Sequence, residues 1–95
     1  MVNDKTGGFE QDRAQSILEC VAENGENWAA GNEPGSFGCH ELLDRTALIA
    51  DLVERTLAAH SACLANEEWY ALARLAANTL HDLYQRIGYE HLSAE

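Results

Sequence analysis

Apolar side chains that recur every three or four positions constrain the fold of this chain more than any other feature. Over residues 39–63 they predict a helix. When successive residues are placed about 100° apart around the helix axis, these apolar residues form one stripe, and Asp44, Asp51 and Arg55 lie opposite it. No segment alternates apolar and polar residues with a period of two, so the sequence predicts an all-α protein. We expect Ile49 at the centre of the core. The stripe consists of Leu42, Thr46, Ile49, Val53, Leu57, His60 and Leu64.

Two further helices are predicted, one on each side of this segment in the chain. The first covers residues 12–24 and stops at Gly25, because glycine commonly provides the left-handed residue that ends a helix. The third covers residues 66–88, with Asn66 as its N-cap and Gly88 as its end. Its apolar stripe consists of Trp69, Leu72, Ala73, Ala76, Leu80, Leu83, Tyr84 and Ile87.

The remaining segments are assigned to connections within a single helical domain of residues 1–95. A chain of 95 residues fits one domain with a modest core. Residues 1–11 are predicted to be a flexible N-terminus, residues 25–38 a loop rich in glycine, and residues 89–95 a tail. Much of the apolar content is alanine, so we expect a thin core with closely spaced helices.

The two longer helices are expected to leave apolar residues outside their common core. Only a short break separates them, so they are predicted to pair as a long antiparallel hairpin. On this pairing Leu48, Leu52 and Leu75 gather on one side of the hairpin, and the short first helix covers only one side. Single exposed leucines are ordinary on protein surfaces. The alternative, which we prefer, is a two-fold homodimer that completes a helical bundle with these three leucines as its interface.

The formal charge of −10 argues against two kinds of direct partner. Binding to a phosphate backbone depends on Lys and Arg, and the chain has 6 of these against 16 Asp and Glu. Anionic membranes also attract basic rather than acidic segments. Four carboxylates, Asp12, Glu19, Glu23 and Glu26, form an acidic face on and just after the first helix. Such a face is usually only solvated; the alternative is an inhibitor or nucleic-acid mimic that blocks a basic nucleic-acid-binding surface.

Cys39, His40 and His91 are the candidate cluster for ligand binding or thiol chemistry. The glycine-rich segment before Cys39 leads into a helix, where free N–H groups can hold an anion and favour a thiolate. The register of the hairpin brings His91 to the same end. However, neighbouring helical residues point about 100° apart, and the spacings typical of zinc ligands are missing. We therefore favour a packed cysteine, and we predict no metal, no cofactor and no catalytic residues.

These observations favour a small acidic protein that acts by protein–protein interaction, as a regulator or adaptor, without catalysis. Its expected partners are a second copy of itself and another protein. The acidic inhibitor is the alternative, and a thiol- or metal-dependent activity at Cys39 and His40 comes third. The first residues lack the apolar stretch of a signal peptide, and the three cysteines lack the pattern of a secreted disulfide scaffold. We therefore expect a cytoplasmic location.

Overall fold

The computed structural model describes residues 8–94, and its helical content confirms the all-α prediction. Of the described residues, 78% are helical, and none lies in a strand. They fall into two units, one that ends at Ala30 and one that begins at Gly31, and each is described by itself. Within this part of the chain no helix combines the length and the apolar character needed to cross a membrane. Most of the predicted flexible N-terminus, residues 1–7, lies outside the described residues.

The first unit contains one helix, α2, which spans Glu10–Asn24. It begins slightly before the predicted start, where the Arg13 guanidinium pairs with the Glu10 carboxylate at 2.6 Å. It ends as predicted at Gly25, which has a φ of 82° and whose N–H donates to the Val21 carbonyl oxygen. None of its residues is fully buried.

The first helix of the second unit is α3, which spans Phe37–Leu52. The prediction of one uninterrupted helix over residues 39–63 is wrong. A π-helix, η1, follows at Val53–Ala58, and a short helix, α4, at Ser61–Leu64. The break comes at His60, whose backbone is extended and whose Nδ1 accepts a hydrogen bond from the N–H of Ala62 at 3.0 Å. His60 is therefore an exposed N-cap of α4 rather than a core residue.

The last helix, α5, spans Glu67–Ser93 and continues past its predicted end. Asn66 caps it as predicted, with its Oδ1 accepting a hydrogen bond from the N–H of Trp69 at 3.0 Å. Gly88 does not stop the helix, and most of the predicted tail at residues 89–95 is helical. A Cβ added at Gly88 would lie 3.7 Å from Leu43 Cδ1, so this glycine sits where α5 contacts α3.

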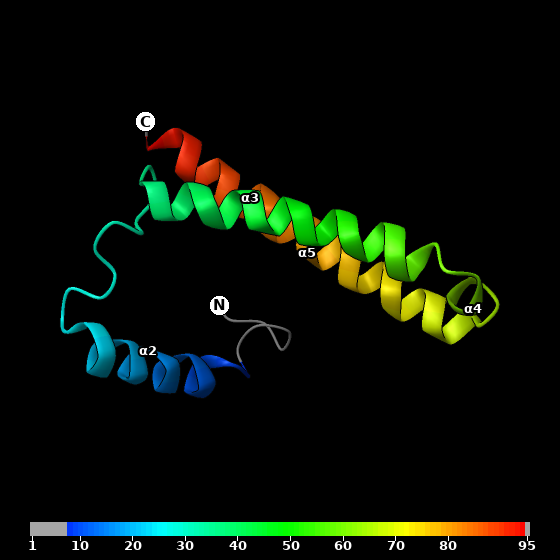
Figure 1. Cartoon of the computed structure of the whole chain (residues 1–95), viewed down its shortest axis with the longest axis horizontal. Coiled ribbons are helices and arrows are strands. Elements are labelled where there is room, and N and C mark those ends of the chain that lie inside the picture. The colour runs from blue at the N-terminus through cyan, green and yellow to red at the C-terminus, as the bar shows by residue number, and fades with distance from the viewer. Residues whose placement is uncertain (1–7, 95) are drawn as a thin grey trace. The chain divides into compact units, whose positions relative to one another are not determined.

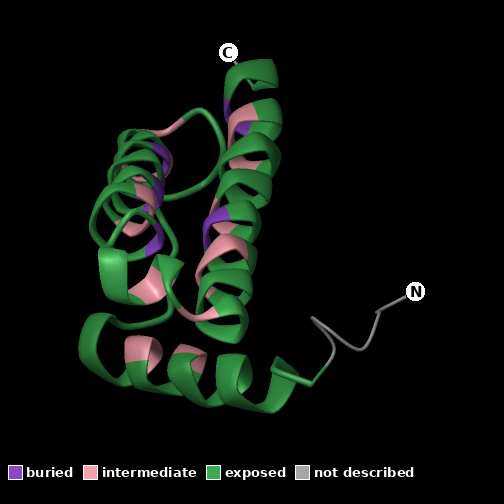
Figure 2. Ribbon diagram, turned by 90° about the vertical axis from the view of Figure 1, so that its right-hand side faces the viewer, coloured by how far each residue is buried: buried purple, intermediate pink, exposed green. Residues whose placement is uncertain are grey.

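Helices α3 and α5 lie side by side, with the start of α3 near the end of α5 (Figure 1). The buried residues lie where the two helices face each other (Figure 2). Most of them are small, which lets the helix axes approach closely. The prediction of Ile49 as the centre of the core is wrong, because Ile49 is 47% exposed and its neighbour Ala50 is buried instead. The buried set is Leu43, Thr46, Ala50, Ala58, Ala77 and His91.

Candidate interaction surface

Large apolar side chains remain exposed along one side of the α3–α5 pair, and we call this side the apolar face. Trp69 is 55% exposed and Leu72 is 60% exposed, although both belong to the stripe that the sequence predicts as core. At about 100° per residue, residues 42 and 49 of α3 project to one side of the contact with α5. Residues 69, 72 and 83 of α5 project to that same side. The exposed members of the apolar face are Leu42, Ile49, Leu52, Leu57, Trp69, Leu72 and Leu83.

The π-helix η1 adds Leu57 to this face. Its wider turn is marked by the hydrogen bond from the N–H of Ala59 to the Glu54 carbonyl oxygen, five residues earlier. Ala58 is consequently buried against α5, while Leu57 is exposed. Leu57 helps to line a hollow of about 480 Å³ that contains no charged side chain. The residues around the hollow are Thr56, Leu57, His60, Ala62, Cys63, Trp69, Leu72 and Ala73.

The opposite side of the helix pair is polar. Glu54 Oε1 lies 3.3 Å from Arg74 Nη1 and 3.2 Å from His81 Nε2, which links η1 to α5. Asp51 pairs with Arg55 at 2.7 Å on the same stretch of chain. Asp51, Glu54 and His81 line one small hollow together, so their carboxylates and imidazole share a side. Asp51 and Glu54 are therefore on a different side of the pair from the apolar face.

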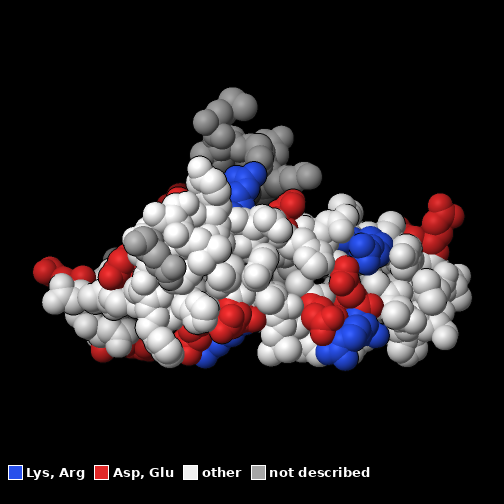
Figure 3. Space-filling model, turned by 90° about the horizontal axis from the view of Figure 1, so that it is seen from above, with Lys and Arg blue, Asp and Glu red and all other residues white. Residues whose placement is uncertain are grey.

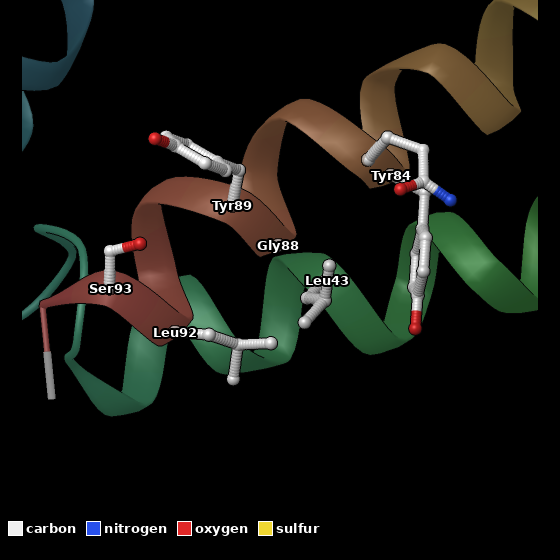
Figure 4. A pocket seen from close by; sticks show the side chains of 7 residues that line it. Leu43, Tyr84, Gly88, Tyr89, Leu92 and Ser93 are labelled. Carbon is white, nitrogen blue, oxygen red and sulfur yellow. The ribbon is translucent and has the colours of Figure 1, made fainter.

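A second hollow, of about 360 Å³, lies beside the buried Leu43 near the end of α5 (Figure 4). Leu43 projects from α3 toward Gly88, with Tyr84 on one side and Leu92 on the other (Figure 4). Tyr89 also lines this hollow and is highly exposed. Gly88 faces Leu43 across this contact, and a Cβ added at Gly88 would still lie at an ordinary distance of 3.7 Å from Leu43 Cδ1.

The three leucines predicted as a dimer interface are all exposed. Leu52 belongs to the apolar face. The helical spacing places Leu48 and Leu75 on the outward sides of α3 and α5, away from the contact between the two helices. Sequence reasoning assigned the apolar face to the core, so it missed this surface; its signal was the long stripe of large residues itself.

The structure brings His40 and His91 together at the end of the helix pair. Their ring centroids lie 5.6 Å apart. His91 is only 2% exposed, and its Nδ1 accepts a hydrogen bond from the N–H of Gly35 at 2.9 Å. His40 is exposed and lies 3.4 Å from Asp44. Within residues 8–94, no three His, Cys, Asp or Glu side chains are arranged to hold a metal ion, so Cys39 does not complete a metal site with the two histidines.

The N–H groups considered for anion binding at the start of α3 are used within the chain. The N–H of Gly38 donates to the Gly31 carbonyl oxygen, and the N–H of Cys39 donates to Ser36 Oγ at 3.2 Å. The N–H of Gly35 donates to His91. These three hydrogen bonds fix the loop to α3 and α5 and occupy donors that an anion would need.

We expect His91→Phe to lower the free energy of unfolding by about 1–2 kcal/mol, because it removes the acceptor of the part-buried hydrogen bond from the N–H of Gly35. His40→Phe is the matched control, since His40 is exposed and holds no backbone group; its effect should stay within about 0.5 kcal/mol. Urea unfolding followed by circular dichroism measures both. Equal effects of the two substitutions would contradict the role assigned to His91.

The four carboxylates of the predicted acidic face are all exposed in the first unit. Among the described residues, no ion pair includes Asp12, Glu19, Glu23 or Glu26. On the face drawn in Figure 3, acidic side chains occur in several separate groups rather than one block. The exposure of the four carboxylates on and after α2 is that of a solvated surface, and it also leaves them accessible to a basic partner.

Comparison with known protein families, characterised proteins and solved structures finds no significant match for this chain.

Proposed function

We propose that this chain acts without catalysis, as a cytoplasmic regulator or adaptor that works through protein–protein contacts and assembles as a homodimer. In this assembly α3 and α5 form an antiparallel hairpin, and two hairpins complete one helical bundle. The observation that carries the proposal is the contrast between the core and the surface of the second unit. Its buried apolar residues are three alanines and Leu43, whereas most of its large apolar side chains are exposed.

Such a core is thin for an independently stable unit. A fully buried leucine, isoleucine or phenylalanine contributes about 1.5–3 kcal/mol, and alanines contribute much less. Small domains already bury a low fraction of their surface and commonly gain the missing stability by association. Burial of the exposed leucines and Trp69 in a second copy supplies the apolar contacts that the single chain lacks.

Sedimentation equilibrium tests the proposed homodimer directly. We expect a dimer at micromolar concentrations of the chain. Because each copy has a charge of −10, the dimer should tighten when NaCl is raised from about 0.05 M to about 0.5 M and screens the repulsion. A protein that stays monomeric at high micromolar concentration in both salts contradicts the proposal.

The alternative function is an acidic inhibitor or nucleic-acid mimic. It is supported by the exposed carboxylates Asp12, Glu19, Glu23 and Glu26, which have no ion-pair partners among the described residues. Salt separates the two functions. A complex between this acidic face and a basic partner weakens as salt rises, whereas association through apolar residues does not.

A further inference from the structure

Each helix of the α3–α5 pair carries two parallel rows of residues that differ by one position in the sequence. Leu42, Ile49 and Leu57 each come directly before a residue that is buried between the helices, namely Leu43, Ala50 and Ala58. In α5 the same relation joins Ala76 to the buried Ala77, and it joins Ile87 to the half-buried Gly88, which faces Leu43. One position corresponds to about 100° around a helix. The second row therefore points nearly at right angles to the contact that the chain already makes.

Two contact rows at nearly right angles are the pattern of a helix in a four-helix bundle, where each helix packs against two neighbours. Within residues 31–94, α3 and α5 each have the other as their long helical neighbour, so the second row has no partner helix in this unit. We propose that a second copy of this chain docks its own α3–α5 pair on the apolar face, so that Leu42, Ile49, Trp69, Leu72 and Leu83 of both copies form the core of a four-helix bundle. This inference rests on the proposed homodimer and assigns its interface.

The area of the apolar face fits this occupant. Its exposed members present on the order of 600 Å² of side-chain surface per copy, near the roughly 800 Å² per partner of a standard interface. The face runs over residues 42–57 of α3 and η1 and residues 69–83 of α5, about 20 Å along each side of the pair. A second helix pair of equal length matches the whole face.

The distribution of charge also permits two copies of a strongly acidic chain to meet here. The carboxylates of Asp51 and Glu54 lie on the opposite, polar side of the pair. The spacing of α3 places Arg45 in line with Leu42, Ile49 and Leu52, and Arg45 pairs with the Glu41 carboxylate at 3.4 Å. Close approach through the apolar face therefore keeps Asp51 and Glu54 of the two copies apart, which docking through the polar side would not.

The assigned interface is tested with two double variants that make the same chemical change. Leu42→Glu with Leu83→Glu alters the apolar face, and Leu48→Glu with Leu75→Glu alters the outward sides of the same two helices. All four leucines are about half exposed, and each variant adds two negative charges. We expect the first variant to raise the dimer dissociation constant by about 100-fold or more, and the second by less than about 3-fold.

The outcomes separate this inference from the proposed function. A monomeric wild type overturns both. A dimeric wild type with a monomeric Leu48→Glu, Leu75→Glu variant and an unaffected Leu42→Glu, Leu83→Glu variant overturns only the interface assigned here. Circular dichroism must show that both variants remain helical.

A second measurement needs no substitution in the helix pair. In a Trp28→Phe protein, whose change lies in the first unit, Trp69 is the remaining tryptophan and belongs to the apolar face. Its fluorescence should shift to shorter wavelength as the concentration passes through the dissociation constant, because dimerisation removes the indole from water. An emission maximum that stays constant while sedimentation reports a dimer overturns the proposal.

Discussion

Ala77→Leu is expected to lower the free energy of unfolding by about 3 kcal/mol, because nothing between α3 and α5 can accommodate a larger side chain. Ala77 has no exposed surface at all. Added methylenes at such a position force the two helices apart and disturb the contacts of Leu43, Ala50 and Ala58 along the same seam. Leucine and alanine have similar helix propensities, so the loss reports packing rather than the stability of α5 alone.

Ala76→Leu is the matched control for this substitution. Ala76 is the preceding residue, is exposed, and lies in the row that points away from α3. The same chemical change there should cost less than about 0.5 kcal/mol, and it adds apolar surface where we place the second copy. Urea unfolding at one fixed chain concentration compares the two variants, since dimerisation makes stability depend on concentration. Similar losses of unfolding free energy for both variants would show that Ala77 does not lie in the contact between α3 and α5.

The sequence predicts the helical class and the approximate segments of this fold, but not the rotation of the helices. Apolar periodicity weights Ile49 and Leu57 above their small neighbours Ala50 and Ala58, so the predicted stripe follows the large residues, although it does include the buried Thr46. The actual contact uses small residues, because they allow close approach of two helices. A helix that contacts two neighbours has two rows of apolar residues, and periodicity alone does not say which row is filled within the chain.

Local signals also have limits at the π-helix and at the end of α5. The segment Val53–Ala58 contains no glycine or proline, so the sequence gives no local signal of its wider turn. A glycine commonly ends a helix, yet Gly88 lies within α5 and faces Leu43 of α3, a position that only the tertiary structure reveals. In the candidate cluster, the register of the helices brings His91 near His40, whereas the hydrogen bond from Gly35 depends on the path of the loop.

Two glycines in the second unit are expected to respond to alanine with opposite signs. A Cβ at Gly38 would lie 2.7 Å from the Gly31 carbonyl oxygen and would also collide with the Asn32 side chain. Backbone cannot move away as a flexible side chain does, so Gly38→Ala must displace the loop. It also weakens the hydrogen bond from the Gly38 N–H to that same carbonyl. We expect a loss of about 2 kcal/mol in the free energy of unfolding.

Gly88→Ala serves as the opposing case within the same helix pair. Its new Cβ would meet only Leu43 Cδ1, at an ordinary contact distance of 3.7 Å. Alanine is favoured over glycine inside a helix by about 0.5–1 kcal/mol, so this variant should be more stable than the wild type. The two alanine variants should therefore differ by about 3 kcal/mol in urea unfolding. If both lost stability, Leu43 would need the space that Gly88 leaves; if both gained it, the loop before α3 would not be held against the helix start. The two substitutions change the free energy of unfolding in opposite directions only when the loop is tightly packed at Gly38 and the helix contact retains room for a methyl group at Gly88.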